Sequence, residues 1–360
     1  MRASGSGGRL PLRFLCQHLD TTPGWRRSHN YRTDARGGGL HANTGRSVLT
    51  MSAPATALDL ELQSILLATD LSAGSVKPLH HALAIARHYG AKLYTAHVVS
   101  AAPYLMAGPE ALELGCQGAC RDVQQLQRDL QRDGSLDGLD HEFVVQRGCV
   151  WDELQTIILQ KQIGLVVVGT HGRRGLEKLI LGSVAEEIFR EANCPVLTVG
   201  PHCYREAGVE FPAETRSYLF ATDLSEASLG ALAHAISFAS RMKARLTLLH
   251  VVPANPISRL PRWYSASEVT LSEENARMTC ERRLEQLVPC DDKIRMKTEF
   301  VVQFGIPSEK ILQVASERKV DLIILGLRPS FLAGTISHVP WTTAYKIVSG
   351  AGCPVLTIRP

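Results

Sequence analysis

One stretch of the chain combines residue types that suit phosphate binding. It follows the apolar run 165–168 and reads Gly-Thr-His-Gly-Arg-Arg-Gly-Leu-Glu-Lys-Leu-Ile-Leu-Gly-Ser over residues 169–183. Gly169 and Gly172 let the backbone turn sharply and approach a ligand without a Cβ in the way. Gly182 and Ser183 open a predicted helix, whose free N–H groups and dipole attract an anion. The spacing therefore predicts a phosphate cradle.

The side chains of this stretch add to the same chemistry. Ser183 supplies a hydroxyl for a phosphate chain or its metal ion, and Arg173 or Arg174 adds positive charge. Taken singly, the glycines are also explained as turn residues and the serine as a helix cap. Their joint occurrence favours a nucleotide site. It is not a Walker loop, because Gly-Lys-Ser/Thr is missing, and its glycine spacing differs from the dinucleotide fingerprint.

Alternating strands and helices must position this loop. The apolar patterns predict strands at 64–69, 92–99, 143–146, 165–168 and 195–199, and helices at 73–89, 110–132, 151–160 and 183–192. Such alternation implies right-handed crossovers and a doubly wound parallel sheet. Ligands of these sheets bind at the carboxyl ends of the strands, where the strand order reverses. The phosphate loop follows one of those strand ends.

The whole pattern occurs twice. Ala-Thr-Asp-Leu-Ser at 68–72 recurs at 221–225, and Cys-Pro-Val-Leu-Thr at 194–198 recurs at 353–357. His97-Val-Val likewise matches His250-Val-Val. We therefore expect two tandem domains, at 58–201 and 216–360, joined by a linker at 202–215 and preceded by residues 1–57.

The motif Gly-x2-Gly-x9-Gly-Ser after an apolar strand resembles the ATP-binding signature of universal stress proteins. The opening Ala-Thr-Asp-Leu-Ser and the closing Cys-Pro-Val-Leu-Thr-Val resemble that family too. The resemblance implies a tandem pair of Rossmann-like α/β domains of the adenine nucleotide alpha hydrolase-like kind. It implies ATP, with Mg²⁺, as cofactor, a role in stress adaptation, and slow hydrolysis at most.

The resemblance also implies a role for each matching residue. The residues that match the family's ATP contacts are Thr69 and Asp70 for adenine and ribose, Val98 for the adenine edge, Val168 and Gly169 for the ribose-side wall, and Gly172, Arg173, Gly182, Ser183 and Val184 for the phosphate cradle.

The second copy of the loop departs from the motif. Gly326 survives, but Pro329 replaces the second glycine and removes an N–H donor. Alignment of the final helices places Trp341 at the position of Gly182, where an indole fills the space of a phosphate, and gives Thr342 a capping role. Asp223 and Val251 persist. We expect no ATP binding in the family mode by the second domain.

Three functions are compatible with these patterns. The first is a nucleotide-dependent regulatory module with an unknown protein partner. The second is an enzyme, a slow ATPase or an adenylyl transferase, which would need substrate-binding loops that the sequence does not show. The third is a structural pseudo-dimer. No catalytic residue and no metal-ligand set stands out, so we expect a binder. His97 and His250 are expected in the core, His171 in an exposed loop, and Cys116 and Cys120 in helix packing.

The two closing strands, 195–199 and 354–358, are strongly apolar, and an exposed apolar edge favours association. We therefore expect them to pair antiparallel within the chain as an intramolecular pseudo-dimer, with a homodimer of the whole chain also open.

The charge of the chain is concentrated at its start. The net charge is +4 for 360 residues, but residues 1–50 alone hold eight Arg and two Asp. The near-neutral remainder gives no electrostatic case for nucleic acid or a membrane surface. No secretory leader is evident. The nine cysteines show no disulfide framework, which favours a cytoplasmic protein. Residues 1–50 are an untranslated segment before a start at Met51, a disordered tail, or a mitochondrial presequence.

Overall fold

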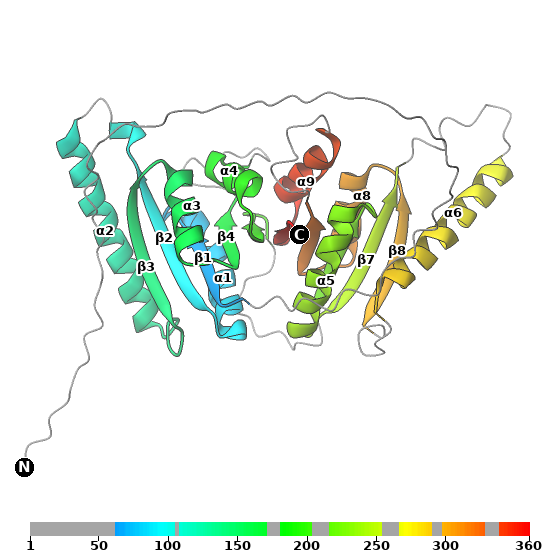
Figure 1. Cartoon of the computed structure of the whole chain (residues 1–360), viewed down its shortest axis with the longest axis horizontal. Helices are drawn as coiled ribbons and strands as arrows, with labels where there is room; N and C mark the ends of the chain where they lie inside the picture. Colours follow the sequence, from blue (N-terminus) through cyan, green and yellow to red (C-terminus); the bar gives the residue numbers. More distant parts are fainter. Residues whose placement is uncertain are drawn as a thin grey trace, which may run out of the picture. The chain divides into compact units, whose positions relative to one another are not determined.

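The protein is described from a computed structural model (Figure 1). The structure describes residues 62–104, 108–170, 181–203, 216–253, 266–289, 297–327 and 338–360. We call residues 62–203 the first repeat and residues 216–360 the second repeat. Among the described helices, none has the length and apolar character that crossing a membrane requires.

Each repeat alternates strands and helices. The first contains β1 (Ser64–Ala68), η1 (Ala73–Ser75), α1 (Val76–Tyr89), β2 (Lys92–Ser100), η2 (Ala102–Tyr104), α2 (Pro109–Arg132), β3 (His141–Gly148), α3 (Val150–Gln160), β4 (Leu165–Gly169), α4 (Ser183–Glu191) and β5 (Val196–Val199). The second contains β6 (Ser217–Thr222), α5 (Glu226–Arg241), β7 (Arg245–Val252), α6 (Ala266–Leu287), β8 (Thr298–Phe304), α8 (Pro307–Glu317), β9 (Leu322–Gly326), α9 (His338–Gly350) and β10 (Val355–Ile358).

The strands of both repeats form one sheet in the described part of the chain. Their order is β3-β2-β1-β4-β5-β10-β9-β6-β7-β8, so each repeat has a doubly wound parallel order that reverses between its first and fourth strands. The α/β class and the tandem doubly wound architecture predicted from the sequence are confirmed.

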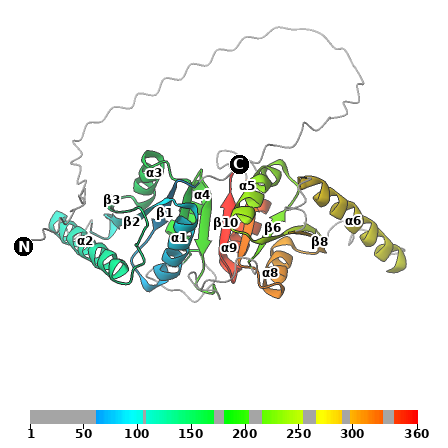
Figure 2. The same ribbon diagram turned by 90° about the horizontal axis from the view of Figure 1, so that it is seen from below.

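The repeats meet at the two closing strands (Figure 2). β5 and β10 pair antiparallel, with Leu356 opposite Leu197 and Val355 opposite Thr198. The hydroxyls of Thr198 and Thr357 each donate to a backbone carbonyl of the other strand. The antiparallel seam predicted from the apolar closing strands is therefore present.

Two apolar layers cover the sheet, one on each face. Alternate residues of β1 show the division: Ile65 and Leu67 belong to the layer that includes α1, whereas Leu66 and Ala68 belong to the layer that includes α3 and α4. Each layer continues into the second repeat, through α5 on one face and through α8 and α9 on the other. The core thus runs across the seam, and a strand buried on both faces reads as an unbroken apolar run.

The first helix begins differently from the sequence expectation. A continuous helix over 73–89 is wrong in its first turn, because η1 precedes α1. The equivalent helix of the second repeat begins at once, at Glu226, where Ser225 caps it through its hydroxyl and the N–H of Ser228. Val76, at the start of α1, is 47% exposed, whereas Leu79, three residues further along, is buried.

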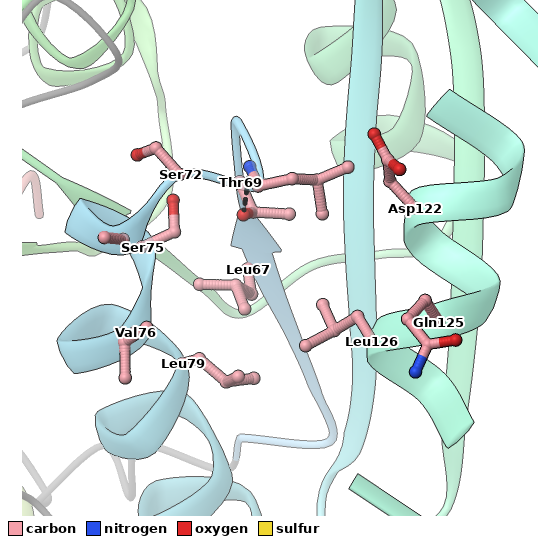
Figure 3. A pocket seen from close by; sticks show the side chains of 11 residues that line it. Leu67, Thr69, Ser72, Ser75, Val76, Leu79, Asp122, Gln125 and Leu126 are labelled. Atoms are coloured by element: carbon pink, nitrogen blue, oxygen red, sulfur yellow. Dashed lines mark hydrogen bonds between the residues drawn. The ribbon is translucent and has the colours of Figure 1, made fainter. Parts of the chain in front are cut away.

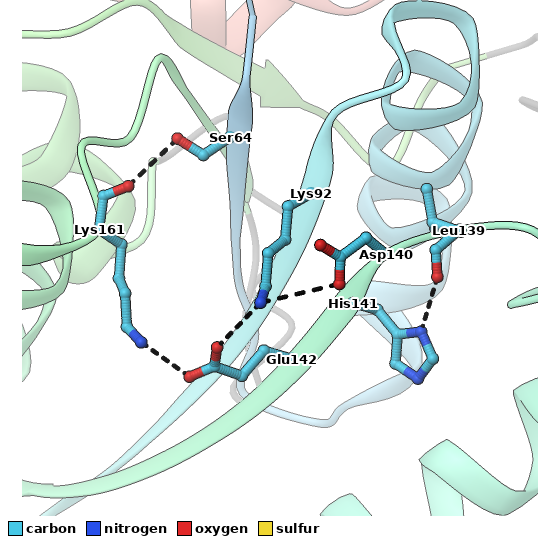
Figure 4. Close-up of polar contacts among 7 residues, drawn as sticks. All are labelled: Ser64, Lys92, Leu139, Asp140, His141, Glu142 and Lys161. Atoms are coloured by element: carbon cyan, nitrogen blue, oxygen red, sulfur yellow. Dashed lines mark hydrogen bonds and ion pairs between the residues drawn. The ribbon is translucent and has the colours of Figure 1, made fainter. Parts of the chain in front are cut away.

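A charged cluster lies at the amino ends of the strands of the first repeat, away from the predicted ligand loops (Figure 4). The Glu142 carboxylate is 2.9 Å from Lys161 Nζ and 3.4 Å from Lys92 Nζ, and both ammonium groups lie 5.2 Å from the centre of the Tyr94 ring. Partial burial raises the pKa of Glu142, but the two lysines outweigh it and hold that pKa below its usual 4.5. This cluster stabilises the end of the sheet opposite the site.

Candidate functional site

A tight turn ends β1 at the carboxyl edge of the sheet. Leu71 has φ 61°, a left-handed conformation that costs a non-glycine residue roughly 1–2 kcal/mol. The turn is held by the Leu71 N–H, which donates to Thr69 Oγ1 at 3.0 Å, and by the carboxylate of Asp70. Asp70 Oδ1 accepts from Ser72 N at 3.0 Å, from Ser72 Oγ at 2.7 Å and from Ser75 Oγ at 2.8 Å. Strain of this kind, fixed by several bonds, is found preferentially at functional sites.

Asp70 therefore builds a turn of its own. The N-cap residues of η1 and α1 are Ser72 and Ser75, so Asp70 is not the capping residue of either helix. Its carboxylate bridges the turn to the start of α1 instead.

The neighbouring strand β2 is tied to this turn. Thr69 N donates to Ala96 O at 3.0 Å, and His97 Nδ1 donates to Thr69 O at 2.8 Å. His97 is 7% exposed, which confirms its assignment to the core. Val98, one residue further, is partly buried against the layer that contains α4. The side chain of Val98 thus lies on the α4 side of the sheet, at the position whose backbone is expected to contact the adenine edge.

The end of β4 and the start of α4 complete the described part of the site. Val168 pairs with Ala68 of β1 and is buried. Gly182 caps α4 with an extended backbone and donates its N–H to Thr170 O at 2.8 Å. Among the described residues, a Cβ on Gly182 would meet Thr170 O, at 3.4 Å, and Ser183 is exposed. The first-turn amides of α4 have no acceptor within the helix, so they are donors for an anion.

Most of the predicted contacts therefore gather at one edge of the sheet. Strands β2, β1 and β4 are adjacent, and the residues at their carboxyl ends are Val98, Thr69 with Asp70, and Val168 with Gly169. Gly182, Ser183 and Val184 begin α4, which follows β4. Gly172, Arg173, Arg174 and His171 lie outside the described residues.

A hollow of about 400 Å³ lies beside this site (Figure 3). It opens between α1 and α2, on the face opposite α4, with Leu67, Leu79 and Leu126 among its apolar walls and Asp122 and Gln125 on α2. Of the predicted nucleotide contacts that the structure describes, only Thr69 lines it. The hollow thus lies on the other face of the sheet from α4, and the exposed side chain of Val76 forms part of its wall.

The second repeat reproduces the turn but not its surroundings. Leu224 has φ 62°, Thr222 Oγ1 accepts from Leu224 N, and His250 Nδ1 donates to Thr222 O at 2.9 Å. Ser228 Oγ, the counterpart of Ser75 Oγ, donates to Thr222 instead of the aspartate.

The end of β9 in the second repeat is closely packed. A Cβ on Gly326 would come within 2.7 Å of Ser228 Cα and 2.9 Å of Ala227 O. The first turn of α5 therefore closes the space on that side of Gly326. Pro329 lies outside the described residues.

The start of α9 corrects one expectation. Because α9 begins at His338, Trp341 and Thr342 lie inside the helix, and the capping role expected of Thr342 is wrong. The position that aligns with the Gly182 cap also lies inside α9, because α9 starts four residues, slightly more than one turn, before the residue that aligns with Ser183.

Titratable groups near the site are few among the described residues. His81 on α1 is largely buried, its Nε2 has no hydrogen-bond partner, and burial, aided by His80 and Lys77, lowers its pKa from 6.5 to about 4. Within the described residues no group of three or more His, Cys, Asp and Glu is placed to hold a metal ion. Cys116 and Cys120 are half-buried thiols of α2.

Comparison with known proteins agrees with this geometry. The model of the universal stress protein family matches residues 61–200 and again 215–359. Universal stress protein MJ0531 of Methanocaldococcus jannaschii is 30% identical over 138 residues, which are 38% of this chain and 81% of that protein. A universal stress protein of Mycolicibacterium smegmatis is 26% identical over 313 residues, covering 82% of this chain and 97% of the relative.

A solved structure supports the fold. The crystal structure of a universal stress protein from Archaeoglobus fulgidus covers 83% of this chain and 97% of its own, with a TM-score of 0.56 at 18% identity. At that identity the likeness concerns the fold alone. Since the family model matches both repeats, the chain belongs to the universal stress protein family and carries two of its units in tandem.

Proposed function

We propose that the first repeat binds ATP together with Mg²⁺ and that the chain is a nucleotide-dependent regulatory module. The observation that carries the proposal is the start of α4. Gly182 caps this helix without a side chain, Ser183 is exposed, and both follow β4 at the point where the strand order reverses. Ligands of doubly wound sheets bind at that point.

The phosphate chain would lie at the first turn of α4. The amides there have no intrahelical acceptor, and the positive end of the helix dipole favours an anion. The exposed hydroxyl of Ser183 suits a phosphate oxygen or Mg²⁺, and the missing side chain of Gly182 leaves room for both. Gly172 and Arg173 belong to the same cradle by the family motif.

The nucleoside would lie over the ends of β1 and β2. Asp70 is an acceptor for ribose hydroxyls, and three bonds from Ser72 and Ser75 fix its carboxylate before a ligand arrives. The side chain of Val98 on the adjacent strand packs against the α4 layer, and its backbone would contact the adenine edge. A site fixed in advance loses little entropy on binding.

The regulatory role is favoured over fast catalysis by the kind of groups that gather here. The site supplies backbone donors, small side chains and one carboxylate engaged by serines. Such groups bind and orient a nucleotide, whereas rapid hydrolysis needs a base that activates water. Occupancy of the site would alter the surface that an unidentified protein partner meets.

Two measurements test the proposal. The full chain is purified, and any retained nucleotide is identified by mass spectrometry. After its removal, calorimetry with ATP and Mg²⁺ is compared with GTP and Mg²⁺ as a control. We expect ATP to bind more tightly than GTP, and a steady-state assay to show turnover well below the median of about 10 s⁻¹ for enzymes. No heat of binding at millimolar ATP would refute the site, and turnover near the enzyme median would refute the regulatory role.

A further inference from the structure

One side chain of the second repeat reaches into the first repeat at the far end of α4. Arg359 follows β10, and its guanidinium donates to three backbone carbonyls at the carboxyl end of α4. Nη1 is 2.6 Å from Ala192 O, and Nη2 donates to Phe189 O and, at 3.0 Å, to Arg190 O. This set of bonds, the Arg359 clamp, holds the helix that begins at the proposed phosphate site.

The acceptors are groups that the helix itself leaves open. The last carbonyls of an α-helix have no intrahelical donor, and the negative end of its dipole attracts a cation. Ala192, the C-cap, has extended backbone, so α4 ends there abruptly. An arginine can fill several such acceptors at once because its donors form a rigid fork.

The matching position of the first repeat carries no arginine that could hold α9. The offset between the closing segments places Gly200 of the first repeat where Arg359 stands in the second. A Cβ on Gly200 would lie 3.7 Å from Ala351 O, the counterpart of Ala192 O. The pseudo-symmetric position is therefore next to the end of α9 but carries no side chain. Within the described residues, the arginine clamp thus occurs on α4, the last helix of the repeat with the intact phosphate motif, and has no counterpart at the matching position beside α9.

The short length of α4 links its two ends. Its nine residues span roughly 13 Å, about two and a half turns, so the helix moves as one rod. At that distance the direct attraction between Arg359 and a phosphate is weak, on the order of 1 kcal/mol for unit charges near a protein surface. The effect of the clamp on a ligand is therefore one of position. Fixing the carboxyl end fixes where the amides at Ser183 and Val184 point.

We propose that Arg359 is a positioning residue for the nucleotide site, so that the affinity of the first repeat for ATP depends on the second repeat through α4. This inference rests on the proposed function and extends it. Coupling between two events is reciprocal, so bound nucleotide would also strengthen the hold of the second repeat on the first. The second repeat then has a role in binding without a site of its own.

The test compares three variants of the full chain. Arg359→Ala removes the clamp, Arg359→Lys keeps the charge but not the fork, and Arg318→Ala is the matched control. Arg318 also belongs to the second repeat, but it pairs with Glu299 and does not touch α4. ATP affinity is measured by calorimetry well below the melting temperature of every variant. Hydrogen exchange of the amides at 183–185 is measured with and without ATP.

Arg359→Ala is expected to weaken ATP binding at least about fivefold, the lower range of coupling between sites, with an intermediate loss for Arg359→Lys. Amides 183–185 should exchange faster in Arg359→Ala and be unchanged in Arg318→Ala. Equal ATP affinity in wild type and Arg359→Ala would overturn the inference, as would equal losses in Arg359→Ala and the control. If Arg359→Ala does not fold, Arg359→Lys decides by the same criteria. A wild-type chain that binds no ATP would refute the proposed function, and this inference with it.

Discussion

Replacing Gly182 by tryptophan should remove nucleotide binding while the chain stays folded. The backbone at Gly182 has φ −61° and ψ 148°, an extended conformation that every residue adopts. In the part of the chain that the structure describes, the nearest atom to an added Cβ is Thr170 O, at the ordinary contact distance of 3.4 Å. The cost to folding is therefore about 1 kcal/mol, the usual effect of a poor N-cap.

The loss of binding should be much larger. An indole on the cap would cover the first-turn amides of α4 and take the place of the phosphates. Two charge-assisted hydrogen bonds are worth about 3–6 kcal/mol together, since each contributes roughly 1.5–3 kcal/mol. Because 1.4 kcal/mol is a factor of ten in affinity, the dissociation constant for ATP should rise at least about a hundredfold.

Calorimetry with ATP and Mg²⁺ measures the effect, and thermal unfolding monitored by circular dichroism confirms the fold. Gly182→Ala is the matched control, because it has the same cap defect without the bulk, and its affinity should stay within about threefold of wild type. A folded Gly182→Trp chain that binds ATP as wild type does would refute the assignment of the phosphates to α4.

Three further outcomes follow from the same geometry. Calorimetry should give one ATP per chain, and two equivalent sites would contradict our expectation that the second repeat does not bind ATP. The buried His81 is neutral in the folded chain, with its pKa lowered from 6.5 to about 4. Its contribution to stability is therefore complete above pH 6.5 and falls by about 3 kcal/mol as the pH approaches 4. Urea unfolding of His81→Gln should lack this part of the pH dependence, and identical pH profiles would argue against it. Leu356→Asp places a charge in the seam opposite Leu197, where both leucines are buried, and should destabilise the chain by about 4 kcal/mol or more. An unchanged urea midpoint would mean that the seam contributes little.

Much of the fold can be predicted from the sequence because its signals are local. A central parallel strand has to be apolar on both faces, so an apolar run such as Leu165–Gly169 can be recognised as a strand from the sequence. The seam is predictable for the same reason, since an apolar strand at a sheet edge needs a partner. The repeat then fixes the equivalent elements of the second half.

The remainder depends on contacts between distant residues. The 3-10 turn before α1 accompanies the hydrogen bonds that Asp70 accepts from the hydroxyls of Ser72 and Ser75. The equivalent Asp223 accepts from the backbone N–H of Ser225, and α5 begins without such a turn. The hollow between α1 and α2 depends on how far apart two helices lie. The Arg359 clamp joins residues about 170 apart in sequence, and no local pattern of residue types predicts such a contact.

The pairing of β5 with β10 also has a consequence for folding during synthesis, because β5 is made before its partner strand. Thr198 of β5 and its partner Val355 of β10 are 157 residues apart in the sequence, so the ribosome completes β5 well before β10. At 5–20 residues per second, the apolar edge of the completed first repeat waits roughly 8–30 seconds for its partner strand. During that interval nascent chains on one polysome carry identical unsatisfied edges, and two of them can pair with each other. Slow elongation through the second repeat would therefore favour strand-swapped assemblies and a need for chaperones.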